Sequence, residues 1–383
     1  MKLLIEIAIA CLITGWLIYP IFVYAVGRFC DARVGGAESS AAGVSLLIAT
    51  RDPVELVQAR ISNIQAYRHE VRLLEIIVAV DYMALNRTEQ YRGVLGDQVR
   101  LVTGDAPGGK AATLNAAVRA ARGDVLIFAD SAQQFLPGAM KALVERLREV
   151  KVGASTGVLQ VANNSKSAFL WGFWAYELWL RKSESRAASI VAVTGAIYAL
   201  RRDLWEPLPA GLICDDLCVP LRVIRRGYRV VSCETAVALD PRSFGPRHEL
   251  NRKVRTLTGM LQMCVLFPWI LNPWKNRAWL QFVFHKLLRI VTPALMAIAL
   301  GAALASMPLA LRLGIGGVAV GSVVILLLLG RRVGIAAKLL RQIGWSLLFL
   351  GAPCVAVANA VRGKWDIWSS PGVERPNRSS TTV

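Results

Sequence analysis

Acidic residues follow three apolar runs in the first third of the chain. Asp52 and Asp81 come just after VSLLIAT and LEIIVAV, and Asp130 ends DVLIFAD. Lys110 follows PGG and begins an alanine-rich segment with helical spacing. Parallel strands share their carboxyl edge, so we expect the three acids at one rim of a sheet, where α/β proteins bind ligands. A helix start with a positive charge suits a phosphate, and Asp130 suits its divalent cation.

Two further features could complete such a site. Asp215 and Asp216 precede a short helix in CDDLCVPLRVIRRGYRVV, and Pro220 implies that this helix starts near Leu217 or is kinked. The segment Ile190 to Arg202 is predicted as a strand pair broken at Gly195, where a missing side chain permits close approach of a ligand. A hydroxyl is a poor nucleophile until a carboxylate takes its proton, and Asp216 fits that role of base.

The elements that must position these residues form an α/β pattern. Four strand-like runs alternate with helical segments of crossover length, which is typical of a doubly wound, Rossmann-like domain with a parallel sheet. The runs are Val44 to Thr50, Leu74 to Val80, Val99 to Gly104 and Asp124 to Asp130. Taken singly, each acid after a strand could be only the N-cap of the next helix. Three acids on one rim favour a binding site.

Composition indicates a membrane protein. Of the 383 residues, 55% are hydrophobic, which exceeds the average for soluble proteins. The net charge of +19 fits cytoplasmic segments beside anionic lipid; no nucleic-acid-binding motif accompanies it, so we expect no nucleic-acid partner. Seven scattered cysteines do not form a disulfide framework and predict free thiols in a reducing compartment.

The apolar segments predict a multi-pass protein of the cell's inner membrane with a cytoplasmic catalytic region, because the basic segment RRVGIAAKLLRQ favours the cytoplasm. Predicted spans are Met1 to Val26, Trp279 to Ala305, Leu309 to Leu329 and Gly344 to Val361. The predicted domains are a transmembrane anchor (1–27), an α/β domain (44–246), an amphipathic interface segment (247–276), C-terminal transmembrane helices (277–362) and a disordered tail (363–383).

Two segments carry aromatic or charged residues with more than one interpretation. The aromatics of AFLWGFWAYELWLRKSES could belong to the core, meet the membrane surface or contact a sugar. His285, Lys286 and Arg289 lie near the end of a predicted span, where snorkelling is the ordinary explanation and a lipid-phosphate contact the sharper one.

Taken together, these motifs resemble the membrane-bound family 2 glycosyltransferases of GT-A fold, related to bacterial poly-N-acetylglucosamine, hyaluronan and cellulose synthases. The matching pieces cover roughly Val44 to Ile290 in the family's order. They are GGKAATLNAA, FADSAQQFLPGAM, FWAYELWLRKSES, VTGAIYALRRDLW, DDLCVPLRVIRRGYRVV, ELNRKVRTLTGMLQ and FHKLLRI. The resemblance implies an inverting enzyme with a nucleotide-sugar donor, commonly a UDP-sugar, and Mg²⁺ or Mn²⁺ on the donor phosphates.

The resemblance also implies roles for individual residues. Asp130 would ligate the metal, Asp216 would be the base with Asp215 beside it, and Gly195 would line the acceptor end. The implied donor-binding residues are Thr50, Asp52, Asp81, Lys110, Arg252 and Arg255.

Three positions depart from the family pattern. Ala132 stands where a second metal-binding acid is usual, Pro53 follows Asp52 where an Asn-Glu pair contacts the nucleotide, and residues 252–256, RKVRT, replace the QxxRW of processive synthases.

The preferred hypothesis is therefore transfer of one or a few sugars to a lipid-linked or polysaccharide acceptor, in exopolysaccharide or cell-envelope glycan synthesis. Membrane lipids and other polysaccharide-assembly proteins are the partners considered. The alternatives are a processive synthase, a catalytically silent binding or assembly subunit, and a transporter or channel. Few intramembrane charges argue against the last of these.

Overall fold

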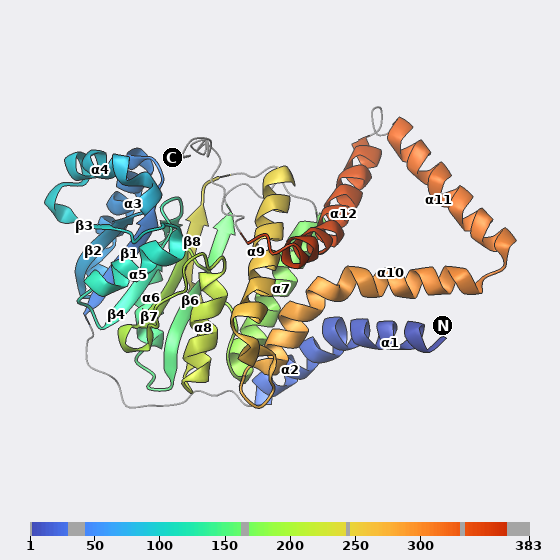
Figure 1. Cartoon of the computed structure of the whole chain (residues 1–383), viewed down its shortest axis with the longest axis horizontal. Coiled ribbons are helices and arrows are strands. Elements are labelled where there is room, and N and C mark those ends of the chain that lie inside the picture. The colour runs from blue at the N-terminus through green and yellow to red at the C-terminus, as the bar shows by residue number, and fades with distance from the viewer. Residues whose placement is uncertain (1, 30–42, 162–167, 243–245, 330–333, 366–383) are drawn as a thin grey trace, which may run out of the picture.

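An eight-stranded mixed sheet forms the core of the α/β domain in the computed structural model, which describes residues 2–29, 43–161, 168–242, 246–329 and 334–365 (Figure 1). The strand order is β3-β2-β1-β4-β7-β6-β8-β5. The strands are β1 Val44–Thr50, β2 Leu73–Val80, β3 Arg100–Thr103, β4 Val125–Ala129, β5 Gln134–Phe135, β6 Val152–Val161, β7 Ile197–Arg201 and β8 Arg229–Asp240. The first four strands of the order are parallel, which confirms the predicted doubly wound beginning, and β7 then pairs antiparallel with β4.

Helices cover both faces of this sheet, which explains why its central strands are apolar throughout. Every residue of β4 is buried, and alternate residues of β1 enter different cores: Leu47 one, Leu46 and Ile48 the other. Burial of each such side chain contributes roughly 1.5–3 kcal/mol. One face carries α3 (Val54–Ala66), α4 (Thr88–Leu95) and α6 (Ala139–Arg146), and the other carries α5 (Lys110–Ala120), α8 (Asp215–Arg225) and part of α9 (Pro246–Leu266).

Two details of the predicted elements were wrong. The segment before Gly195 is not a strand, and β7 begins only at Ile197. The amide groups of the segment before Gly195 already have other partners: Ile190 N–H donates to the Val230 carbonyl, and Thr194 N–H donates to Thr156 Oγ1. Helix α8 begins at Asp215 rather than near Leu217, with Pro220 inside it.

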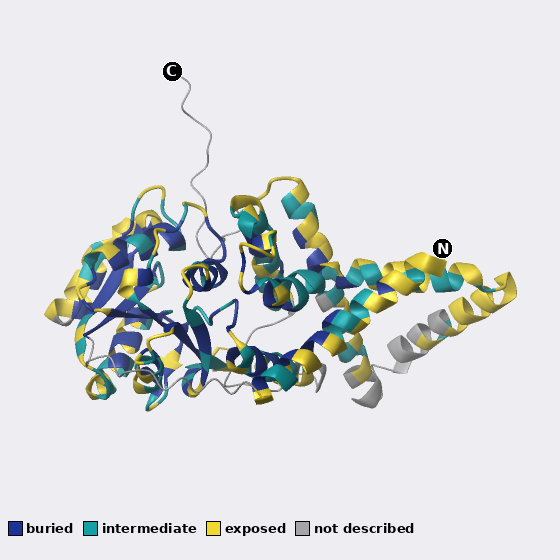
Figure 2. Ribbon diagram, turned by 90° about the horizontal axis from the view of Figure 1, so that it is seen from below, coloured by how far each residue is buried: buried dark blue, intermediate teal, exposed yellow. Residues whose placement is uncertain are grey.

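Apolar helices extend away from the sheet (Figure 2). Three are long and apolar enough to cross a membrane: Lys2–Phe29, Gln281–Ser306 and Gln342–Val361. They comprise α1 (Lys2–Ile13) with η1 (Thr14–Ile18) and α2 (Tyr19–Phe29), η7 (Gln281–Leu287) with α10 (Leu288–Ser306), and most of α12 (Gly334–Val361). Helix α11 (Leu309–Leu329) is also apolar, but it is not one of these three, so the fourth span remains a prediction.

The apolar helices pack against one another and against the α/β domain. Helix α1 lies along α10, α2 packs on α7 (Ala168–Ala187), and α9 packs on α12. Gly15 and Gly27 allow the close approach, because a Cβ at Gly15 would lie 1.8 Å from Leu288 Cδ2 and one at Gly27 would lie 2.9 Å from the Ser183 carbonyl oxygen. The predicted interface segment 247–276 contributes Met260 and Met263 to the core of the α/β domain. Of the predicted tail, 366–383 lie outside the described residues.

Candidate active site

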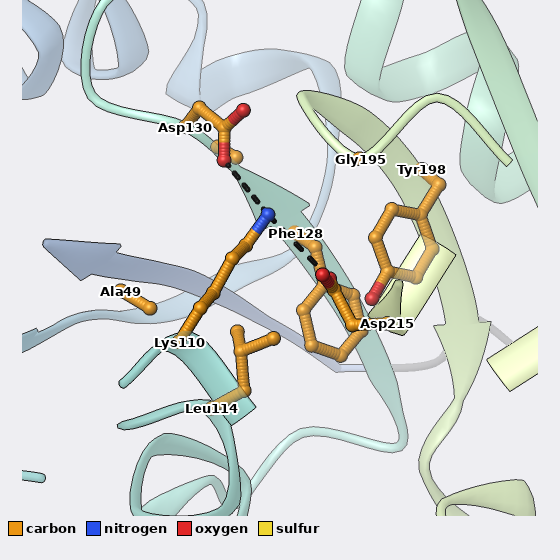
Figure 3. A pocket seen from close by; sticks show the side chains of 9 residues that line it. Ala49, Lys110, Leu114, Phe128, Asp130, Gly195, Tyr198 and Asp215 are labelled. Atoms are coloured by element: carbon orange, nitrogen blue, oxygen red, sulfur yellow. Dashed lines mark ion pairs between the residues drawn. The ribbon is translucent and has the colours of Figure 1, made fainter. Parts of the chain in front are cut away.

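A small cavity of about 10 Å³ lies where the carboxyl ends of β1 and β4 meet the starts of α5 and α8. Its lining includes Lys110, Asp130, Gly195, Tyr198 and Asp215 (Figure 3). These residues come from segments that are far apart in the sequence, and the fold brings them to one point. The fold thus brings Asp130 and Asp215 together beside Lys110, whereas Asp216 does not line the cavity.

Lys110 is the central charge of the site. Its Nζ atom lies 3.3 Å from Asp130 Oδ1 and 3.5 Å from Asp215 Oδ2, as the dashed lines in Figure 3 mark. Burial lowers the pKa of Lys110, but the carboxylates of Asp130, Asp215 and Asp216 outweigh burial and raise it above the ordinary value. Lys110 is therefore a permanent ammonium at neutral pH, held at the rim between two carboxylates.

The turn before Lys110 is organised by Asp81. The Asp81 carboxylate accepts hydrogen bonds from Met83 N–H at 2.9 Å and from Gly109 N–H at 3.1 and 3.2 Å. Gly108 and Gly109 both have φ of +94°, and a Cβ at Gly108 would lie 2.7 Å from Asp81 Oδ1. Asp81 is therefore the N-cap that the sequence left open as an alternative. It also fixes the position of the helix that Lys110 begins.

Replacing Asp81 by alanine is expected to lower the free energy of unfolding by about 1–3 kcal/mol, because buried N–H groups lose their acceptor. Turnover is expected to fall with it, since Lys110 loses its fixed position. Asp81→Asn keeps one carbonyl oxygen and should lie between alanine and wild type. Thermal melts and initial rates check this, with Asp105→Asn as control because Asp105 pairs with Arg119 at the surface. Equal stability of Asp81→Ala and wild type would contradict the anchoring role.

Pro220 explains how Gly195 reaches the site. A proline has no N–H, so the carbonyl four residues earlier, that of Asp216, is left without its helical partner. That carbonyl accepts the N–H of Val193 at 2.9 Å, which docks the segment before Gly195 onto α8. A Cβ at Gly195 would lie 3.5 Å from Lys110 Nζ and 3.8 Å from Asp216 Cβ. The absent side chain therefore keeps open the space between Lys110 and Asp216.

Asp216 has the electrostatics of a base that works near neutral pH. Burial and the neighbouring Asp215 carboxylate raise its pKa to about 6, while Lys110 and Arg255 oppose the rise. Such a carboxylate is ionised at pH 7 yet binds a proton more readily than a solvated one. A pKa near the working pH is the usual requirement for general base catalysis.

Tyr198 is a site residue that the sequence analysis missed. Its ring stacks on Phe128 at a centroid distance of 4.4 Å, and its buried hydroxyl has no hydrogen-bond partner among the described residues. The hydroxyl points toward Asp215 in Figure 3, and Asp215 Oδ2 likewise accepts no hydrogen bond in the described part of the chain. The strand IYALR carries no chemical signal, so only the pairing of β7 with β4 reveals this residue.

The remaining residues predicted to bind the donor do not line the cavity; they are Thr50, Asp52, Arg252 and Arg255. Thr50 Oγ1 accepts hydrogen bonds from Ser131 Oγ at 2.8 Å and from Asp52 N–H at 3.0 Å, which joins the ends of β1 and β4. Arg255 acts electrostatically on Asp216. Arg252 is bonded instead to Glu249, at 2.6 Å, and lies over Trp174.

Comparison with known proteins identifies the fold of the chain and the class of protein to which it belongs. The model of the family described as "Glycosyltransferase like family 2" matches residues 42–259, more than half of the chain. The chain belongs to this family. It is a glycosyltransferase, and its α/β domain has the GT-A-like fold that the sequence predicted. The alternative of a transporter or channel is therefore set aside.

Solved structures extend the comparison. The mannosyltransferase PcManGT from Pyrobaculum calidifontis, in complex with GDP-Man and Mn²⁺, has 18% identity and a TM-score of 0.68 over 94% of this chain and 99% of that one. Glucosyl-3-phosphoglycerate synthase from Mycobacterium tuberculosis, solved with phosphoglyceric acid, has 16% identity and a TM-score of 0.41 over 63% of this chain and 83% of that one. No curated protein sequence matches the chain significantly.

The described residues at the cavity fit a divalent cation that is bound through a single protein carboxylate. The described residues contain no group of three His, Cys, Asp or Glu side chains that could hold a metal ion. Asp130 is 39% exposed at the cavity, whereas Ala132 is buried and offers no ligand. Mg²⁺ can be bound by one carboxylate together with substrate phosphates and water. Asp130 fits this mode, in which the donor completes the coordination.

Proposed function

We propose that this glycosyltransferase is an inverting enzyme of the cell membrane that uses a nucleotide-sugar donor, in the first place a UDP-sugar. The acceptor is a lipid-linked sugar or a glycan at the cytoplasmic surface, in exopolysaccharide or cell-envelope synthesis. The observation that carries the proposal is Lys110, held between Asp130 and Asp215 in the cavity that Gly195 keeps open toward Asp216. One ammonium, one exposed carboxylate and one raised-pKa carboxylate are the groups that such a transfer needs.

The proposed reaction assigns a task to each group. The acceptor oxygen forms a bond to the anomeric carbon while the bond from that carbon to the donor phosphate oxygen breaks. The hydroxyl proton passes to the Asp216 carboxylate. The nucleoside diphosphate leaves with its new negative charge beside Lys110, which stabilises it. Mg²⁺ or Mn²⁺, held by Asp130 and the donor phosphates, would supply further charge stabilisation.

The lengths of the apolar helices support a membrane setting, and the basic connection between the last two predicted spans supports a cytoplasmic catalytic domain. Addition of one or a few sugars, rather than processive synthesis like that of poly-N-acetylglucosamine or hyaluronan synthases, is supported by Thr256. This residue stands where the processive signature has tryptophan, and its hydroxyl donates to the Arg252 carbonyl.

Release of nucleoside diphosphate from a panel of nucleotide sugars tests the proposal, with full-length protein in nanodiscs. One donor class should be turned over, and chelation by EDTA should lower the rate by at least about 10²-fold, because the cation contributes several kcal/mol to charge stabilisation. Excess Mg²⁺ or Mn²⁺ should restore the rate. Asp130→Asn should show a comparable loss.

Asp124→Asn is the matched control, because Asp124 precedes the same strand at its opposite end. It should keep the wild-type rate and metal response. Full turnover after chelation would contradict the metal assignment. Failure of every donor, with the protein folded, would contradict the proposed function.

A further inference from the structure

A cluster of charged side chains, with His285 and Glu184 buried and the others half-buried, joins the catalytic domain to the apolar helices. His285 Nδ1 lies 2.9 Å from both carboxylate oxygens of Glu184, and its Nε2 lies 2.9 Å from Glu177 Oε1. Lys286 Nζ lies 3.3 Å from Glu177 Oε1, and Arg289 also pairs with Glu177. The two glutamates belong to α7, whereas the three basic residues belong to the first turns of the candidate span Gln281–Ser306. None of these residues takes part in the proposed sugar transfer.

Cations from several elements gather at this cluster. Arg181 acts electrostatically on Glu177 and Glu184, and Lys253 acts on Glu177. Two further carboxylates share these charges, because Glu249 acts on Lys253 and Asp216 acts on Arg181. Burial and the positive charges of Arg252 and Arg289 lower the pKa of Lys253 to about 8. A clamp between α7 and the span Gln281–Ser306 would account for the bonds to Glu177. It would not account for Lys253, which α9 brings to the same Phe173 ring that Arg289 contacts, and a bound anion would balance two cations placed so close together.

Two buried polar atoms in the cluster, Arg289 Nη2 and the Tyr176 hydroxyl, have no hydrogen-bond partner of acceptable geometry within the described residues. Arg289 nevertheless lies close enough to Tyr176 to act on its hydroxyl. The Arg289 guanidinium lies over the rings of Trp16, Phe173 and Tyr176, at 5.4, 5.6 and 5.8 Å, and Lys253 Nζ lies 4.7 Å from the Phe173 ring centre. Donors and cations thus converge on one aromatic-lined place. A phosphate group has the charge and the acceptor oxygens that this place needs.

The surroundings favour a lipid as the source of that phosphate. Trp16 lies in the first candidate span, where its neighbours Leu17 and Ile18 are 56% and 53% exposed. Arg289, which lies over the Trp16 ring, is near the start of its own candidate span, where cationic side chains reach the lipid headgroups. A molecule with a phosphate in the cluster can therefore lay its apolar chain along these helices.

The cluster also connects to the reaction site. Arg181 donates to Thr194 Oγ1 at 3.2 Å and to the Ala192 carbonyl at 3.3 Å, in the segment that carries Gly195. Lys286 acts electrostatically on Asp216 as well as on Glu177. A ligand anchored at the cluster would thus have its neighbouring groups close to the acceptor side of the cavity.

We infer that Lys253, Lys286, Arg289 and Tyr176 bind the phosphate group of the acceptor lipid at the membrane surface. That the phosphate belongs to the acceptor rests on the proposed function, whereas the phosphate-binding site itself rests on the cluster alone. Its probe is farnesyl phosphate, a phosphomonoester with an apolar chain, bound to full-length protein in phosphatidylcholine nanodiscs. Farnesol and inorganic phosphate are the two comparison ligands.

Farnesyl phosphate is expected to bind at least tenfold more tightly than either comparison ligand. Arg289→Gln should weaken it about tenfold or more, because a charge-assisted bond and the guanidinium charge are lost. Tyr176→Phe, which keeps the ring and the helix packing, should weaken it by a few fold. Arg225→Gln is the matched control, because Arg225 also lies over an aromatic ring, that of Trp269, but away from the cluster. It should bind like wild type.

Proton uptake on ligand binding distinguishes a phosphate site from a purely structural clamp, which would take up no protons. The pKa of Lys253 is lowered to about 8, and a bound phosphate raises it, so binding near that pH should take up protons. Calorimetry in buffers of different ionisation enthalpy measures this uptake, and Lys253→Met should abolish it. Equal binding of farnesol would overturn the phosphate assignment, and equal binding of inorganic phosphate would overturn the lipid assignment. Unchanged affinity in both Arg289→Gln and Tyr176→Phe would overturn the site.

The same preparation separates this inference from the proposed function. Release of nucleoside diphosphate without acceptor reports the donor site, which Arg289→Gln should leave intact. Binding of farnesyl phosphate without turnover of any nucleotide sugar would contradict the proposed function and support the phosphate site. Turnover without binding of farnesyl phosphate would do the reverse.

Discussion

Asp216→Asn is expected to lower sugar transfer by about 10²–10⁴-fold, the usual contribution of a general base. Asparagine keeps the shape of the side chain but cannot take the acceptor proton. The affinity for nucleoside diphosphate should change little, since Lys110, Asp130 and Asp215 remain in place. Single-turnover rates and nucleotide titrations of the nanodisc protein check the two parts separately. Asp203→Asn, at an exposed carboxylate paired with Arg201, is the control. Retained transfer in Asp216→Asn would remove Asp216 as the base.

The pH profile of the wild type belongs to the same prediction. Because Asp216 must be ionised to act, the rate should rise through about pH 6 and level off above it. Its pKa is raised in the folded state, so folding is most favourable with this group protonated and loses that contribution as the pH rises through about 6. Asp216→Asn removes the buried charge, and its melting temperature at pH 8 should be equal to or above that of wild type. Below about pH 4 the difference should vanish, because the wild-type group is then protonated in both states.

Local sequence patterns were sufficient to predict those site residues whose positions follow from the direction of the strands. A continuous apolar run such as DVLIFAD predicts a strand buried on both faces, and the acid after it must then lie at the carboxyl rim. The same pattern predicts Asp130 at the rim where Lys110 begins its helix, and the distance of 3.3 Å between their charged atoms agrees. The pair of glycines before Lys110 likewise predicted the helix start, which both positive φ angles explain.

Features that depend on which strands pair could not be predicted from the sequence. Nothing local distinguishes Tyr198 from a core tyrosine, and only the antiparallel pairing of β7 with β4 stacks it on Phe128 at the cavity. The prediction of a strand before Gly195 was wrong for the same reason. The amides of that segment bond to Thr156 and to the Asp216 carbonyl, which belong to other elements. The aromatic helix α7 had three interpretations, and its exposed Trp171 together with the burial of Leu180 shows that its sides differ.

Lys110→Met should lower the rate of sugar transfer by about 10²–10³-fold, the loss found when one preorganised group that stabilises developing charge is removed. Methionine keeps much of the buried aliphatic stem but removes the ammonium beside the departing diphosphate. It should also move the acid limb of the pH profile upward from about 6, because Lys110 opposes the rise in the pKa of Asp216 that burial and Asp215 cause. A merely structural lysine would lower the rate without moving that limb.

The comparison that isolates this effect uses two further variants. Lys141→Met removes an exposed lysine paired with Glu145 and should change neither the rate nor the pH profile. Asp215→Asn removes the negative charge that raises the pKa of Asp216, so its acid limb should move downward, opposite to that of Lys110→Met. Opposite displacements would show that Lys110 and Asp215 act on one ionisation, that of Asp216. Displacement in the same direction, or none in either variant, would mean that the limb reports another group and that the cavity is not organised around the ammonium of Lys110.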